Sequence, residues 1–180
     1  MRASCRISTS EPAAGPELTV TEPKQPEPKE PARAYGDEAE IEAIVGEFEA
    51  GTLPNRRWSH FAHLTVTTHY LRRDGYERVA AELPDRIRRY NLASGVPNSD
   101  TRGYHETITQ VFLLGLRRYL ALLPQGQTLL AAVNGLLTSP FGHRDFPLRF
   151  YSRALLFSVA ARRGLVAPDL QPLERIETLS

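Results

Sequence analysis

Residues 104–123 read YHETITQVFLLGLRRYLALL, and this stretch decides the fold. Its apolar residues recur every three or four positions, which is the period of an amphipathic α-helix. One face of the predicted helix carries His105, Thr109, Phe112, Leu116, Tyr119 and Leu123. Pro124 ends the helix, because proline has no N–H to continue the hydrogen-bond ladder. The segment is the most apolar of the chain, so we expect it to form the central helix, which begins at about Thr101 or Tyr104 and ends at Leu123.

Segments with a similar period flank this one on both sides, bounded by capping residues, Gly or Pro. The predicted helices cover residues 37–50, 59–73, 76–92, 127–137 and 147–157, with a short turn after Ser158. Pro84 lies inside the third, where its missing N–H predicts a kink or a break. Residues 64–68 are rich in β-branched side chains that favour strands, but no turn residue interrupts the segment around them. We therefore expect an all-α protein, a single compact bundle of about six helices.

Length and composition exclude several classes of protein. The chain has 180 residues, about one domain, and its net charge of +1 gives no electrostatic case for nucleic-acid binding. No apolar run approaches the roughly 18 residues that a membrane span needs. Cys5 is the single cysteine, which excludes an intramolecular disulfide and favours a reducing, cytoplasmic location.

The first 35 residues differ from the rest of the chain. They hold six of the 14 prolines together with Glu, Lys, Ser and Thr. Such a segment cannot bury enough apolar surface to offset its ordering entropy, so we predict a disordered leader at 1–35 and a helical domain at 36–180. Both lysines of the chain, Lys24 and Lys29, lie in this leader. The folded domain is therefore expected to lack lysine, which excludes Schiff-base chemistry.

Three histidines are expected to face a shared interior. His60 and His63 are three residues apart on one helix, so their side chains can reach a common point, and His105 lies on the apolar face of the central helix. His69 falls on the opposite side of its helix and is expected to be solvated. Three neutral imidazoles between two helices could hold a divalent metal such as Fe, Mn or Zn. The alternative is that they are core histidines with hydrogen-bonded ring nitrogens.

Other polar residues near these histidines suggest further roles. Glu106 lies about 100° from His105 around the helix, so it is better placed as a proton carrier beside the site than as a metal ligand. Arg102 precedes the central helix, and a helix start with an arginine nearby can bind an anion. The remaining candidates for substrate binding are Tyr104, Thr109, Tyr151 and Arg153.

Three words of the sequence carry a resemblance to a known family. They are WSHFAHL at 58–64, RGYHETI at 102–108 and YSRALLFS at 151–158, with PDL at 168–170. On these words the chain resembles a bacterial family of small uncharacterised helical proteins. The resemblance implies functional importance for His60, His63, His105 and Glu106, and it implies no particular reaction. The chain departs from the family pattern at Pro84 and in its Pro-rich leader.

Two classes of function fit these observations. The first is a small helical enzyme, metal-dependent through His60, His63 and His105, in which Glu106 and His105 act on a small polar or anionic metabolite. Hydrolysis, elimination and iron-dependent oxidation all fit, and a metal-free variant would use one histidine as base and another as acid. The second is a non-catalytic helical module that binds a ligand or a protein. Neither needs a nucleic acid or a membrane, and both allow a homo-oligomer.

Overall fold

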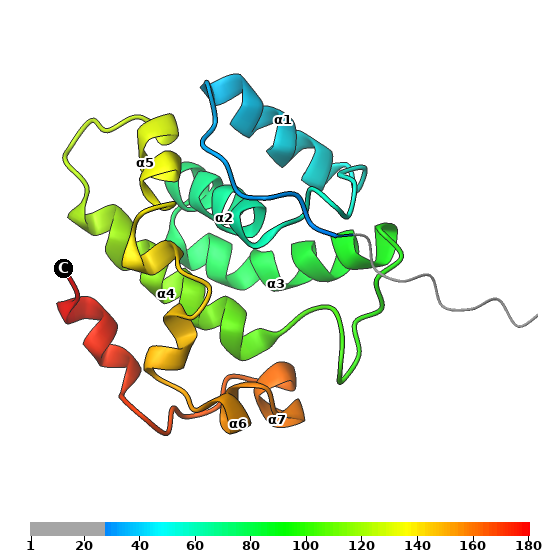
Figure 1. Ribbon diagram of the computed structural model, residues 1–180, viewed down its shortest axis with the longest axis vertical. Helices are drawn as coiled ribbons and strands as arrows, with labels where there is room; N and C mark the ends of the chain where they lie inside the picture. Colours follow the sequence, from blue (N-terminus) through cyan, green and yellow to red (C-terminus); the bar gives the residue numbers. More distant parts are fainter. Residues whose placement is uncertain (1–27) are drawn as a thin grey trace, which may run out of the picture.

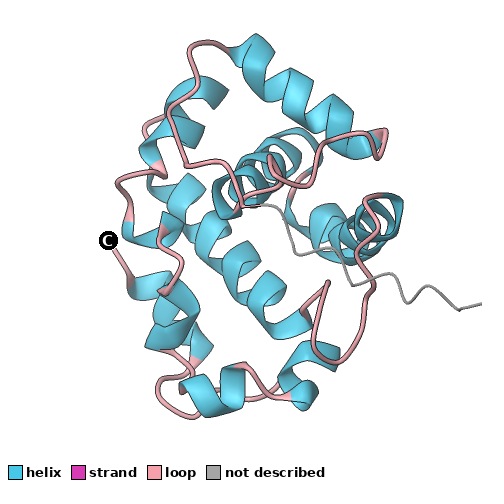
Figure 2. Cartoon of the chain, turned by 45° about the vertical axis from the view of Figure 1, so that its right-hand side comes forward, coloured by secondary structure: helices cyan, strands magenta, loops and turns pink. Residues whose placement is uncertain are grey.

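The computed structural model describes residues 28–180, and every regular element within that range is a helix. The long helices are α1 (Glu38–Glu49), α2 (His60–Asp74), α3 (Tyr76–Ala93) and α4 (Glu106–Leu122). The short ones are α5 (Leu129–Gly135), α6 (Arg153–Leu156), α7 (Val159–Arg163) and the 3₁₀ turns Pro140–Gly142, Phe146–Arg149 and Leu173–Thr178. The predicted all-α class is confirmed (Figure 2). None of the helices described is long and apolar enough to cross a membrane.

Two helices organise the core. α2 packs against α1, α3, α4 and α5, and α4 also contacts α3, α7 and all three 3₁₀ turns. Figure 1 shows α4 running between the α1–α3 group and the C-terminal segment. The side chains of Val66 on α2 and of Val111, Leu113 and Leu116 on α4 are completely buried. The helix predicted to be central, α4, therefore shares the centre of the fold with α2.

Two of the expected helix boundaries differ in the structure. α3 runs from Tyr76 to Ala93 without a break at Pro84, whose ring is buried. The packing of α3 against α1, α2 and α4 offsets the one hydrogen bond that proline cannot make. The single helix expected at 147–157 is instead two short pieces. They are separate because Ser152 starts α6 anew, accepting from the N–H of Leu155 at 3.3 Å.

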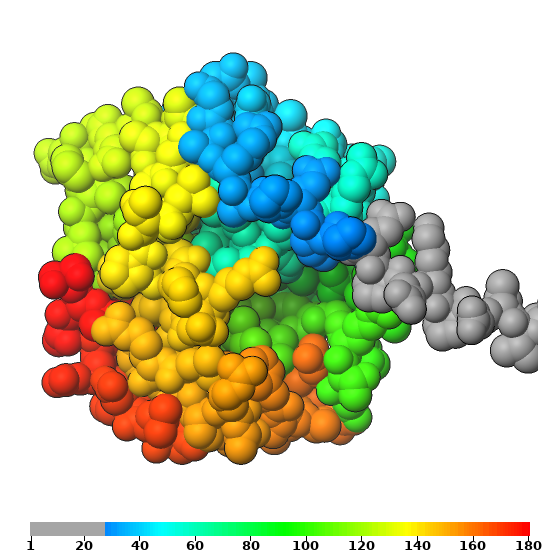
Figure 3. All heavy atoms as spheres, in the orientation of Figure 1, coloured from blue at the N-terminus to red at the C-terminus, as the bar shows by residue number. Residues whose placement is uncertain are grey.

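Residues 28–35, at the end of the predicted leader, contact the helical domain. The backbone of Tyr35 exchanges two hydrogen bonds with the amide of Asn134, at 2.8 and 2.9 Å, and its ring stacks on Phe61. The N–H of Glu30 donates to the carbonyl oxygen of Arg56 at 2.8 Å. In Figure 3 this segment (blue) lies at the edge of a hollow in the surface whose floor is green. The remainder of the predicted leader, residues 1–27, lies outside the described part of the chain.

Candidate functional site

A cavity of about 430 Å³ opens between α2, α3, α4 and the segment that precedes α1. We call it the His63 cavity. Its wall is mostly apolar, formed by residues such as Leu64, Leu83, Ile87, Ile108 and Phe112. Its polar lining includes most of the site residues predicted from the sequence, namely His60, His63, Arg102, Tyr104, His105 and Thr109. The structure thus brings the histidines of both sequence motifs, WSHFAHL at 58–64 and RGYHETI at 102–108, to one cavity.

The loop before α4 owes its shape to a glycine. Gly103 has φ +81°, and a Cβ at this position would lie 2.4 Å from the carbonyl oxygen of Pro97, so no other residue fits. The side chain of Asn98 accepts a hydrogen bond from the N–H of Tyr104 at 3.1 Å. This tight turn directs Arg102 and Tyr104 to the wall of the cavity.

His63 has the side chain most available to a ligand. Its ring lies against the ring of Trp58, tilted by 32° with the centroids 3.7 Å apart, and neither ring nitrogen hydrogen-bonds to a residue between 28 and 180. Burial lowers the pKa of His63 to about 3, and the charges of His60 and Lys29 act in the same direction. The imidazole is therefore neutral at pH 7, and it offers one donor and one acceptor.

His60 and His105 are held by the backbone. The Nε2–H of His60 donates to the carbonyl oxygen of Gly142 at 2.9 Å, which leaves only Nδ1. The Nε2–H of His105 donates to the carbonyl oxygen of Leu156 at 2.9 Å, and its Nδ1 accepts from the N–H of Ile108 at 3.3 Å. His105 is the N-cap of α4, so the prediction that it lies within the helix is wrong.

These contacts leave no set of three imidazoles for a metal ion. Both ring nitrogens of His105 are used, and in the part of the chain that the structure describes no group of three or more His, Cys, Asp or Glu side chains could hold a metal. The three-histidine ligand set predicted from the sequence is therefore not formed by His60, His63 and His105 as they stand.

Glu106 does not line the His63 cavity. Its carboxylate accepts from the hydroxyl of Tyr104 at 2.9 Å and from the side-chain amide of Gln110 at 2.8 Å, and it pairs with Arg88 at 3.4 Å. Burial, with the charge of Glu106, raises the pKa of Tyr104, so its hydroxyl stays protonated and donates. In this position Glu106 orients Tyr104, and the geometry does not support the proton-carrying role expected from the sequence.

Tyr151 and Arg153 also lie away from the cavity. Tyr151 is fully buried, and its hydroxyl donates to the carbonyl oxygen of Val166 at 2.8 Å. Arg153 is exposed, with its guanidinium over the ring of Phe157. The structure therefore places neither of the two predicted substrate-binding residues in the lining of the His63 cavity.

Two residues, Lys29 and His69, lie in surroundings that the sequence did not predict. Lys29 lines the cavity, where its ammonium group contacts the backbone and side-chain oxygens of Asn55. Burial, together with the charge of Arg102, lowers the pKa of Lys29.

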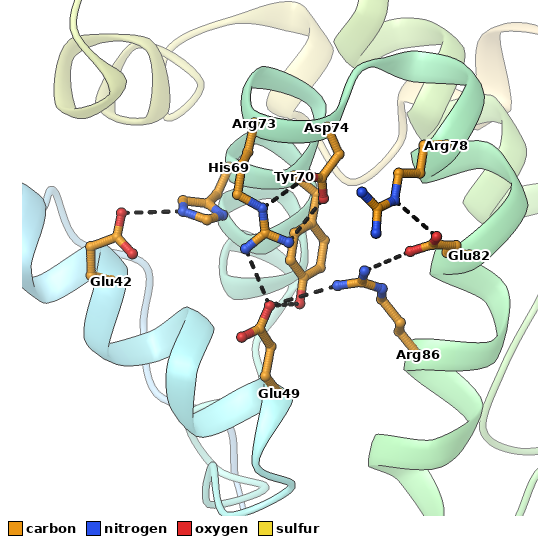
Figure 4. A network of polar contacts seen from close by, with 9 residues as sticks. All are labelled: Glu42, Glu49, His69, Tyr70, Arg73, Asp74, Arg78, Glu82 and Arg86. Atoms are coloured by element: carbon orange, nitrogen blue, oxygen red, sulfur yellow. Dashed lines mark hydrogen bonds and ion pairs between the residues drawn. The ribbon is translucent and has the colours of Figure 1, made fainter.

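His69, expected in solvent, is buried because α1 packs on that side of α2, and its Nε2 lies 3.1 Å from Oε1 of Glu42 (Figure 4).

Comparisons with protein-family models, with curated proteins and with solved structures found no match. The resemblance to a family of small helical bacterial proteins therefore stays a prediction. The proposals below depend on the geometry and charge of the His63 cavity.

Proposed function

We propose that the His63 cavity binds a small organic anion with an apolar body. One observation carries this proposal: the described lining contains two cationic side chains, Lys29 and Arg102, and no aspartate or glutamate. Two cations that share a partly apolar wall without a carboxylate between them leave a positive potential, which an anionic ligand would offset.

The remaining lining determines what kind of anion fits. A volume of about 430 Å³ suits a small metabolite, and the ring of Phe112 with the aliphatic side chains of α3 and α4 would cover its apolar part. The neutral ring of His63 can donate to one ligand oxygen or accept from a hydroxyl. The occupant we propose is therefore a carboxylate or phosphate ester that carries an aromatic or short aliphatic group.

A second candidate function is catalysis without a metal, because His63 presents a ring that makes no hydrogen bond to the residues described. In the free protein a histidine with a pKa of about 3 is a weak base. An anion seated beside Lys29 would offset the charge of Lys29, which opposes protonation of His63. His63 would then take a proton from the bound substrate or from water, as the base of an elimination or a hydrolysis.

Binding of matched ligands tests the proposal. Benzoate, hexanoate and phenyl phosphate should raise the melting temperature of the full chain, whereas the uncharged benzyl alcohol should have little effect. Arg102→Gln should weaken benzoate binding about tenfold, corresponding to roughly 1.4 kcal/mol. The matched control is Arg153→Gln, which removes an exposed arginine away from the cavity and should leave affinity unchanged. Equal binding of benzoate and benzyl alcohol, or equal losses in both variants, would contradict the proposal.

A further inference from the structure

We infer that Lys29 is a reactive amine that forms an imine with a carbonyl compound bound in the His63 cavity. The inference extends the proposed function, because it assigns the ligand a carbonyl group in addition to its negative charge. Lysine is scarce in this chain: Lys29 is the only one between residues 28 and 180, and Lys24 is the only other. Twenty of the 22 basic residues are arginines, which cannot form imines.

The segment around Lys29 holds its amine in place. The N–H of Glu30 donates to the carbonyl oxygen of Arg56 at 2.8 Å, and the Nε of Arg56 donates to the carboxylate of Glu30 at 3.2 Å. Glu30, which follows Lys29, is thus bonded to Arg56, which follows Asn55. The backbone and side-chain oxygens of Asn55 contact the Lys29 amine. The lysine enters the cavity wall from a short segment that is fixed by its neighbours.

The Lys29 amine is a cation in the resting cavity, and its surroundings increase the fraction that is neutral and nucleophilic. Lysines are commonly kept charged by a carboxylate, and the cavity lining has none; the neighbouring charges are those of Arg102 and, when protonated, His63. A neutral amine has two N–H donors and one lone pair. The two oxygens of Asn55 can accept both hydrogens, which leaves the lone pair for an incoming carbon.

The chemical step needs only the protein, the carbonyl compound and water. The lone pair of Lys29 Nζ attacks the carbonyl carbon, the C–N bond forms, and the carbonyl oxygen takes up the proton that the nitrogen loses. The resulting carbinolamine then loses its hydroxyl with the second amine proton as one water molecule, so that a C=N bond replaces the C–O bond. Arg102, on the same cavity wall, would hold a carboxylate of the same ligand. The expected substrate class is an aldehyde or ketone that also carries a carboxylate and an apolar body.

Reductive trapping tests this inference on the full chain. Protein is incubated at pH 7 with 4-formylbenzoate and cyanoborohydride, and the modified sites are located by peptide mass mapping. Lys29 should be labelled about tenfold faster than Lys24, because Arg102 on the same cavity wall would hold the carboxylate of the probe and so place its carbonyl group beside the Lys29 amine. Lys29→Arg should remove the fast labelling and keep the charge, whereas Lys24→Arg should leave it intact. Labelling of Lys29 at the rate of Lys24 would overturn the inference. If Lys29→Arg does not fold, the site map of the unmodified chain still decides.

A second measurement separates this inference from the proposed function. 4-Methylbenzoate has the same shape and charge as the probe but no carbonyl group that can form an imine. It should bind the unmodified chain and slow the labelling of Lys29 by its occupancy of the cavity. If it binds while Lys29 labels no faster than Lys24, the imine is wrong and the anion site stands. If Lys29 labels quickly but 4-methylbenzoate neither binds nor competes, the reactive amine stands and the anion site is wrong.

Discussion

Charged side chains are arranged in opposite ways in two regions of this protein. Between α1, α2 and α3 they are matched: Glu49 contacts Tyr70, Arg73 and Arg86, and Glu82 pairs with Arg78 and Arg86 (Figure 4). We call this the Glu49 network. In the His63 cavity two cations and a neutral imidazole face the same space with no carboxylate in the lining described. Matched charges hold the helices together, and under the proposed function the charges without a counterpart are where the ligand binds.

Trp58 joins the two regions, and its removal should have the largest effect. Its ring stacks on Phe48 from α1 at 4.6 Å and lies tilted against His63 at 3.7 Å. Trp58→Ala should lower the free energy of unfolding by about 3–5 kcal/mol, because it leaves a hole in the core. Ligand affinity should fall as well, since His63 loses its support. Urea denaturation measures the first and titration with benzoate the second. A loss of stability under 1 kcal/mol would show that the two regions are not joined through this ring.

A substitution in the Glu49 network should affect stability alone. Burial raises the pKa of Tyr70 to about 12, so its hydroxyl stays protonated and donates to Glu49 at 3.1 Å. Glu49→Ala removes the acceptor and leaves this hydroxyl without a partner, at a cost of about 1–3 kcal/mol by urea denaturation. Glu49→Gln keeps an acceptor and should lose at most about 1 kcal/mol, as expected for exposed ion pairs. Benzoate affinity should stay within about twofold in both variants, and a larger change would remove the contrast between the regions.

The pH dependence of stability should report the unmatched charge in the cavity. The pKa of His63 is about 3 in the folded chain and about 6.5 when unfolded, so the unfolded chain binds the extra proton between these values. The stability that His63 contributes is present above pH 6.5 and is lost as the pH falls toward 3. Its loss at pH 5 should be about 1–2 kcal/mol by the linkage relation.

The matched controls isolate this contribution from other acid effects. His63→Asn should flatten the difference in unfolding free energy between pH 7 and pH 5, whereas His143→Asn should not, because the side chain of His143 is 69% exposed. The same slope in the unmodified chain and in His63→Asn would show that His63 is not the group that titrates.

The helical fold was predictable to the extent that local periodicity determines it. The three-residue spacing of His60 and His63 and the apolar period after residue 104 placed both histidine words on one interior, where the structure has them. The role of His105 was not predictable, because its carbonyl partner Leu156 lies 51 residues away in the sequence. The prediction for His69 failed because helical period gives the faces of α2 and not the number of helices that cover them. Lys29 was missed because it lies in a Pro-rich segment whose composition predicts disorder. Its contact with Asn55 joins residues 26 positions apart, which local patterns do not reveal.

The smallest expected effect is the response to metal ions, which tests whether the His63 cavity binds a cation in place of an anion. If the cavity is an anion site, added Zn, Fe or Mn should leave the melting temperature of untagged protein unchanged within about 1 °C, since no cation gains from two positive neighbours. To bind a metal with all three imidazoles, His105 would have to give up the carbonyl of Leu156 and uncap α4. A rise in melting temperature that disappears in a His63→Ala, His105→Ala double variant would show that this rearrangement occurs. The ligand of the cavity would then be a cation, and the charges of Lys29 and Arg102 would need another explanation.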